Sequence, residues 1–200
     1  MKFLLALWAS LLLGCSPKPV CSDCPLAPEL PIQHNLPVAA ALSHGELQLI
    51  QRATYSVTAV ILSIKRYDTW FPGLDLMDGA APLDLALAWG PVASRPDIQD
   101  QLKVSQRHRF FFWRAGKGNL LPIRQALLTG MANTHIVPAN EKVAEQIDGL
   151  EVGQVVLLSG SLVDISRNGR VMRTSMTRDD YGAGACEILY VDHVEVKGRQ

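Results

Sequence analysis

Apolar residues alternate with polar ones along most of the chain, with the period of two that is typical of β-strands. Residues 55–67 are rich in β-branched side chains and are apolar on both faces in their middle, which predicts a long central strand. Further strands are expected over four later segments, at residues 107–114, 153–166, 171–176 and 186–196.

Two glycine positions predict how these strands connect. Asn168-Gly169 separates two strand segments by two residues, which predicts a tight hairpin. Gly160 interrupts an apolar strand and is typical of a bend or bulge, as at the corner of a barrel. We therefore expect a mainly β domain with short helices (α+β), built as a small β-barrel of the oligonucleotide/oligosaccharide-binding (OB) type.

Four short helices are expected between the strands. Ser43 and Glu46 have the spacing of a capping box, which predicts a helix that continues to residue 51. Residues 82–91 begin with proline and end with Gly-Pro, which favours a second helix. Residues 123–129 predict another turn of helix, and residues 140–147 a helix with Asn140 as its N-cap.

The first fifteen residues predict the cellular location. Lys2 precedes an uncharged apolar run at 3–13, which as a helix would span about 16 Å, half the hydrocarbon core of a bilayer. This length predicts a signal peptide rather than a membrane-spanning helix. The run ends in Leu12-Leu13-Gly14-Cys15, which resembles the lipobox of bacterial lipoproteins. The alternative is an ordinary secretory signal that happens to contain a cysteine.

The lipobox resemblance implies that residues 1–14 are removed and that Cys15 carries the lipid that holds the protein on the bacterial cell membrane. Ser16 after the lipidated cysteine implies the outer membrane, facing the periplasm. Residues 15–38 contain half of the twelve prolines, which predicts an extended, Pro-rich tether. Residues 39–200 are then one β-rich globular domain. The tether is interpreted as a spacer rather than as a Pro-rich ligand.

Composition and charge exclude some functions. The chain has 19 basic and 19 acidic residues and 48% hydrophobic residues. A disordered protein would be less apolar, and a nucleic-acid-binding protein would carry net positive charge, so no nucleic-acid partner is expected. Phe110 to Trp113 stand among arginines, and we expect these aromatic residues in the core and the arginines, including Arg109, in solvent.

Three cysteines remain after Cys15. In the oxidising periplasm a disulfide is expected, joining Cys21 to Cys24 or either of them to Cys186. Cys21 and Cys24 have CxxC spacing, but Pro25 and the absence of a preceding strand disfavour a redox role. Cys186 is expected to be buried and structural, because Glu187 is its neighbour and His193, the nearest histidine in sequence, falls on the opposite strand face.

Candidate chemistry is sparse. His135 could be a general base, and Asp179 and Asp180 stand in a polar loop before the last strand. We treat these three residues together as a speculative polar site. No nucleophile elbow and no metal-binding motif occurs, so neither metal nor cofactor is expected. We therefore favour a non-catalytic envelope component that binds a protein or glycan. The alternative is a periplasmic hydrolase that uses His135 with Asp84, Asp179 or Asp180.

Three segments resemble blocks of an uncharacterised set of bacterial envelope proteins, at residues 84–91, 133–139 and 184–191. The resemblance spans roughly residues 55 to 191. It implies one domain that contains Trp89, His135 and Cys186, and it implies no catalytic residues.

Overall fold

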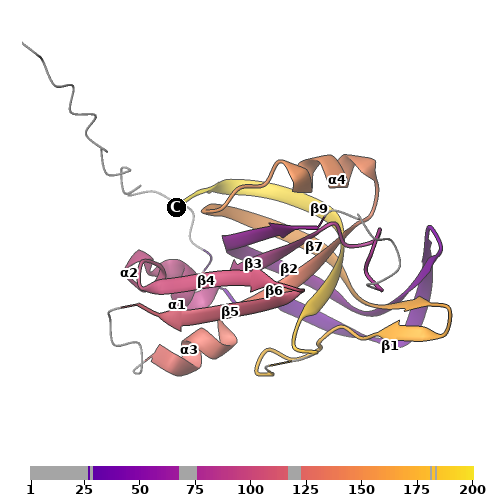
Figure 1. Cartoon of the computed structure of the whole chain (residues 1–200), viewed down its shortest axis with the longest axis horizontal. Helices are drawn as coiled ribbons and strands as arrows, with labels where there is room; N and C mark the ends of the chain where they lie inside the picture. Colours follow the sequence, from indigo (N-terminus) through magenta and orange to yellow (C-terminus); the bar gives the residue numbers. More distant parts are fainter. Residues whose placement is uncertain (1–26, 28, 68–75, 117–122, 181, 183) are drawn as a thin grey trace, which may run out of the picture.

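The computed structural model describes residues 27, 29–67, 76–116, 123–180, 182 and 184–200 (Figure 1). These residues form nine strands and four short helices, which confirms a mainly β fold with short helices. The strands are β1 (Ile32–His44), β2 (Leu47–Arg66), β3 (Leu83–Ala88), β4 (Leu102–Arg107), β5 (Phe110–Ala115), β6 (Met131–Pro138), β7 (Gln154–Arg167), β8 (Arg170–Met172) and β9 (Glu187–Arg199). The helices are α1 (Gly90–Ser94), α2 (Pro96–Gln99), α3 (Arg124–Thr129) and α4 (Glu141–Asp148).

Seven strands form one large sheet in the order β1-β2-β3-β6-β9-β7-β8. Strand β2 also pairs with β7, so the pairings close a circuit through β2, β3, β6, β9 and β7. All pairings are antiparallel except that of β6 with β9. Strands β4 and β5 form a separate two-stranded sheet.

Strand β2 is central, as its two apolar faces predict. Tyr55, Val57 and Ile61 are buried in the main hydrophobic core. Val60 points the other way, into a second buried cluster beneath the β4–β5 hairpin. Burial of both faces accounts for the missing polar positions in the middle of the strand.

The predicted bend at Gly160 and the predicted hairpin turn at Asn168-Gly169 are both confirmed. The register of β7 against β9 shifts at Gly160, and a Cβ atom there would overlap the carbonyl oxygen of Tyr190. Asn168 and Gly169 have φ of 51° and 76° and join β7 to β8 as an antiparallel hairpin. Positive φ at both residues is the geometry of a type I′ turn. The strand that follows, however, ends at Met172 rather than at residue 176.

Two predicted helices are wrong. Residues 43–51 form a hairpin between β1 and β2, with Gly45 at φ of 58° in the turn. Strand pairing there overrides the local capping-box spacing. Within residues 82–91, β3 is a strand with all six residues buried, and α1 begins only at Gly90. A strand buried on both faces has no alternation, so its apolar run was indistinguishable from a buried helix.

The later helices are confirmed. α3 lies within residues 123–129. α4 follows Asn140, whose side chain accepts a hydrogen bond from the Val143 amide at 3.1 Å. Val143 and Ile147 are buried against the main core.

Strand β1 begins at Ile32, inside the segment that was expected to be tether. The predicted signal peptide lies outside the described residues.

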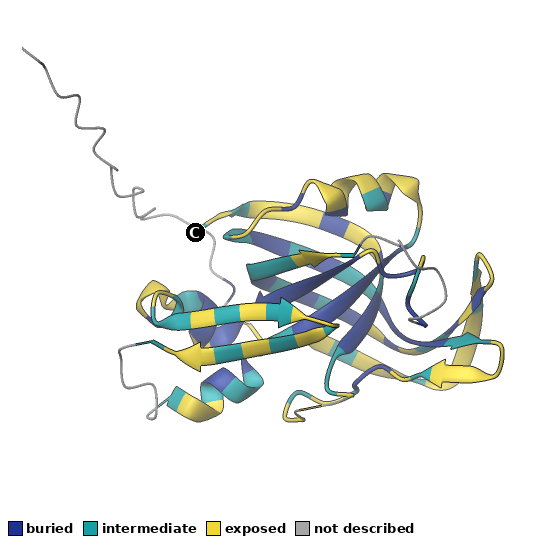
Figure 2. Ribbon diagram, in the orientation of Figure 1, coloured by how far each residue is buried: buried dark blue, intermediate teal, exposed yellow. Residues whose placement is uncertain are grey.

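The expected strand at 107–114 is confirmed from Phe110 onwards as β5, but its first residues end β4 and form a turn. β4 ends at Arg107 and β5 begins at Phe110, so His108 and Arg109 form the turn, with φ of 51° and 67°. This hairpin lies across β3 and β6 (Figures 1 and 2), and Gln106 donates a hydrogen bond to Asn133 at 2.7 Å. The turn therefore delivers Arg109 onto the outer face of the large sheet.

Among the described residues, no helix has the length and apolarity needed to cross a membrane.

Candidate functional site

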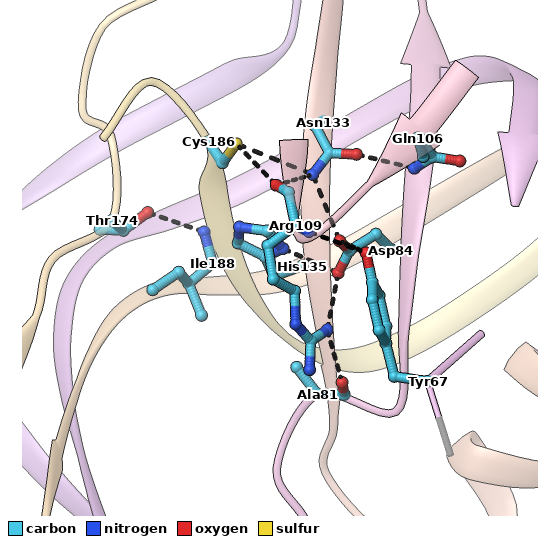
Figure 3. A network of polar contacts seen from close by, with 10 residues as sticks. All are labelled: Tyr67, Ala81, Asp84, Gln106, Arg109, Asn133, His135, Thr174, Cys186 and Ile188. Carbon is cyan, nitrogen blue, oxygen red and sulfur yellow. Dashed lines mark hydrogen bonds and ion pairs between the residues drawn. The ribbon is translucent and has the colours of Figure 1, made fainter. Parts of the chain in front are cut away.

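Two buried side chains of opposite charge face each other across β3 and β6. Asp84 and His135 are direct partners in the antiparallel register, so their side chains leave the sheet on the same face. Asp84 Oδ1 lies 2.7 Å from His135 Nδ1 (Figure 3). Asp84 is fully buried and His135 is 4% exposed. The imidazole is therefore fixed by its Nδ1, which leaves Nε2 for another partner.

Three further donors surround the Asp84 carboxylate. Tyr67 donates from its hydroxyl at 2.9 Å, Arg109 from Nη1 at 3.0 Å and Asn133 from Nδ2 at 3.4 Å. Burial raises the pKa of Asp84, but the hydrogen bond and charge of His135, with Arg109 and Tyr67, outweigh burial and lower it. Asp84 is thus an ionised carboxylate with every near neighbour a donor.

Arg109 is held in place from several sides. Its guanidinium lies 3.7 Å from the centre of the Tyr67 ring and donates to the Ala81 carbonyl at 2.9 Å. Burial and the Asp84 carboxylate raise the pKa of Tyr67, so this phenol remains a donor at neutral pH. The expectation that Arg109 lies in solvent is wrong, because its side chain is only 12% exposed and forms an ion pair with Asp84.

Cys186 completes the cluster from a third element. It directly precedes β9, which runs parallel to β6, so its thiol lies next to the residues that β6 presents. Its Sγ lies 3.7 Å from Asn133 Nδ2 and 3.7 Å from the Arg109 carbonyl oxygen (Figure 3). Cys186 is half-buried and has no disulfide partner among the described residues. The expectation that Cys186 is buried is wrong, because the residue is half-buried, and the pairing of β9 with β6 places it beside His135.

His135 is positively charged in this setting. Burial, the largest influence, lowers its pKa, but hydrogen bonds and electrostatic interactions with Asp84 and Cys186 outweigh burial and raise the pKa of His135 to about 9. At neutral pH the imidazole is therefore an imidazolium between a carboxylate and a thiol.

The cluster opens into a cavity of about 640 Å³. His135, Cys186, Arg109 and Tyr67 line it, whereas Asp84 lies behind His135, away from the cavity. The remaining lining side chains are apolar or basic, apart from Asp78: Leu76, Met77, His108, Phe110, Arg170, Met172, Arg173 and Ile188. A thiol that faces a cavity, an imidazole beside it and a carboxylate behind the imidazole is an arrangement used for covalent catalysis.

Of the three aspartates expected as possible partners of His135, the structure brings only Asp84 to it among the described residues. Asp179 and Asp180 are absent from the described lining of the cavity, and Asp180 instead accepts a hydrogen bond from Ser175 at 2.7 Å. Cys21 and Cys24 lie outside the described residues, so a disulfide with Cys186 stays a prediction.

Sequence reasoning missed Tyr67, Arg109 and Asn133. Asn133 stands two residues before His135 on β6 and shares its face, a period-two relation that could have indicated it. Tyr67 follows β2 and Arg109 is in the β4–β5 turn, and both reach Asp84 only through contacts between residues distant in sequence. The aromatic segment is also divided: Phe111 and Trp113 pack on the core, whereas Phe110 and Phe112 are exposed.

Within the described part of the chain, no three His, Cys, Asp or Glu side chains are arranged to hold a metal ion. No protein-family model matches the sequence, and searches of curated proteins and of solved structures also find no match.

Proposed function

We propose that this domain is a hydrolase of acyl compounds (esters, thioesters or amides) with Cys186 as its nucleophile. The observation that carries the proposal is the Asp84–His135–Cys186 cluster, in which the thiol lines a cavity and the carboxylate lies behind the imidazole. A buried ion pair alone would need neither a thiol nor a cavity.

In the reaction, the Cys186 thiolate attacks the carbonyl carbon of the substrate, and the C–S bond forms as the carbonyl π bond opens. The tetrahedral intermediate collapses, the bond to the leaving group breaks, and the His135 imidazolium gives its proton to the departing alcohol, thiol or amine. A thioester on Cys186 results. Water then attacks the thioester carbon while neutral His135 accepts a proton from it. The second tetrahedral intermediate collapses, the C–S bond breaks, and the carboxylic acid leaves as the Cys186 thiolate and the His135 imidazolium re-form.

The surrounding residues orient this pair. Asp84 holds His135 through Nδ1, so that Nε2 is the nitrogen left to exchange protons with Cys186 and the substrate. Gln106 holds the side-chain oxygen of Asn133, which turns the Asn133 amide group toward Asp84 and Cys186. Preorganised groups of this kind lower the reorganisation that the transition state requires.

The direct test is acyl-enzyme formation. The full mature protein is treated with p-nitrophenyl acetate at neutral pH, and release of p-nitrophenol is followed together with the mass of the protein. We expect a burst of product and one acetyl group on Cys186. Cys186→Ala should abolish both, and His135→Gln should slow the burst roughly a hundredfold or more.

A double Cys21→Ser, Cys24→Ser variant is the matched control, because it removes the other free-thiol candidates and should retain the burst. Acetylation that persists at the same rate in Cys186→Ala, or a His135→Gln protein as fast as the parent, would contradict the proposal. Circular dichroism of each variant verifies that the fold is retained.

We propose further that Cys15 carries a lipid anchor and that the domain lies on the outer membrane, facing the periplasm. The Leu12-Leu13-Gly14-Cys15 run supports this proposal. Mass spectrometry of the protein from bacterial membranes should find a diacylglyceryl Cys15 as the first residue. A Cys15→Ala protein that is still lipidated would contradict it.

For the fold itself, we infer a small closed barrel of the OB type. The circuit of pairings through β2, β3, β6, β9 and β7 supports this inference, as does the parallel β6–β9 pair. Helix α4, which connects β6 to β7, lies at one end of that circuit.

A further inference from the structure

Two arginines that the catalytic cluster does not use line the same cavity. Arg170 lies in β8 and Arg173 follows this strand, and both are exposed. Within the described part of the chain neither forms an ion pair, in contrast to Arg109, whose charge Asp84 compensates. Asp78 is the one acidic residue among the described residues that line the cavity. This wall therefore carries uncompensated positive charge.

The backbone fixes this wall next to the thiol. The Ser175 amide donates to the Cys186 carbonyl at 3.0 Å, and the Ile188 amide donates to Thr174 Oγ1 at 2.9 Å. The Thr174 amide in turn donates to buried Asp164 at 3.0 Å. Arg173 thus stands directly before a segment that is hydrogen-bonded to Cys186 and to Ile188, two residues further along the chain. A group bound by Arg173 would lie near the nucleophile.

The rest of the described lining is largely apolar. Met77, Met172 and Ile188 give the cavity a surface suited to hydrocarbon, while the two arginines give it cations in the fork geometry that pairs with carboxylate or phosphate oxygens. A cavity that offers both apolar and cationic groups matches a ligand with the same two parts.

We propose that the substrate is an anionic acyl compound, whose carboxylate or phosphate group binds Arg170 and Arg173 while its carbonyl carbon lies at Cys186. The inference rests on the proposed role of Cys186 as nucleophile. It adds the substrate class, and it assigns Arg170 and Arg173 as specificity-determining residues.

The test compares two alkylating reagents of similar size, neutral iodoacetamide and anionic iodoacetate. The rate at which each modifies Cys186 in the full mature protein is measured by mass spectrometry at neutral pH. An isolated thiolate repels iodoacetate, which is then the slower reagent. We expect iodoacetate to react at least as fast as iodoacetamide, with a rate that saturates as its concentration rises.

The variant Arg170→Gln, Arg173→Gln should lower the iodoacetate-to-iodoacetamide rate ratio roughly tenfold, because only iodoacetate carries the anionic group that the arginines bind. The control is Arg124→Gln, an exposed arginine on α3 away from the cavity, which should leave the ratio unchanged. Arg170 and Arg173 are both exposed, so the double variant should retain its fold. Slowing of iodoacetamide by glutarate or by inorganic phosphate then identifies which anion the arginines prefer.

The outcomes separate the two proposals. A Cys186 that reacts fast with iodoacetamide but shows no arginine-dependent preference for iodoacetate overturns the anionic substrate and leaves the hydrolase intact. A Cys186 that is slow toward both reagents overturns the hydrolase, and the substrate inference with it.

Discussion

The variant Asp84→Asn should change the protonation of His135 and, through it, the stability of the domain. Asn keeps the size of Asp84 and one oxygen acceptor for the His135 Nδ1 proton, but it removes the buried negative charge. Burial, which is the largest influence on the pKa of His135 and lowers it, is then no longer outweighed by the Asp84 charge. We expect the pKa of His135 to fall from about 9 to its ordinary value of 6.5 or lower.

The sign and size of the stability effect follow from linkage. The pKa of His135 is higher in the folded state than in the unfolded state, so its contribution is fully present below pH 6.5 and is lost as pH rises through 9. The shift from 6.5 to about 9 corresponds to about 3 kcal/mol. Asp84→Asn should therefore cost most at about pH 6, and the cost should shrink by about 3 kcal/mol towards about pH 9.5. The ion pair with Arg109, also lost, adds an offset that is independent of pH in this range.

Two measurements test this expectation together. Proton NMR titration follows the His135 ring signal, assigned with a His135→Gln variant, and urea denaturation gives the free energy of unfolding at each pH. Asp97→Asn is the matched control, because Asp97 also pairs with an arginine but is exposed, and its cost should be small and constant over this pH range. A His135 signal that still titrates near pH 9 in Asp84→Asn, or a cost that does not vary with pH, would refute the reasoning.

Two further substitutions test the fold. Gly160→Ala should destabilise the domain by about 3 kcal/mol or more, because the new Cβ overlaps the Tyr190 carbonyl; Gly45→Ala, with nothing within 4 Å of the new Cβ, should cost only about 1 kcal/mol for its positive φ. Equal costs in urea denaturation would contradict that assignment. Asn140→Ala should remove the N-cap bond to the Val143 amide and cost about 1 kcal/mol, and an unchanged urea midpoint would show that the cap contributes nothing.

The fold was predictable where the signal is local. The long strand at 55–67, the Asn168-Gly169 turn, the bend at Gly160 and the helix after Asn140 all depend on propensity, positive φ or capping within a few residues. The helix expected over residues 82–91 failed for a non-local reason, since strand β3 in this segment is buried on both faces by partners distant in sequence. Its pattern therefore lacks the alternation by which a strand is recognised.

The site was less predictable because it is assembled by pairing alone. Asp84 and His135 are 51 residues apart and meet only because β3 and β6 pair in one particular register, which a slip of one residue would abolish. Cys186 was judged against His193, its neighbour in sequence, whereas the parallel pairing of β9 with β6 gives it His135 as its neighbour in space. The reactivity of a thiol depends on the charges around it, and these charges come from three elements that no local pattern connects. A lone cysteine in sequence is thus uninformative until the strand order is known, and the strand order here is what turns Cys186 from a packing residue into a candidate nucleophile.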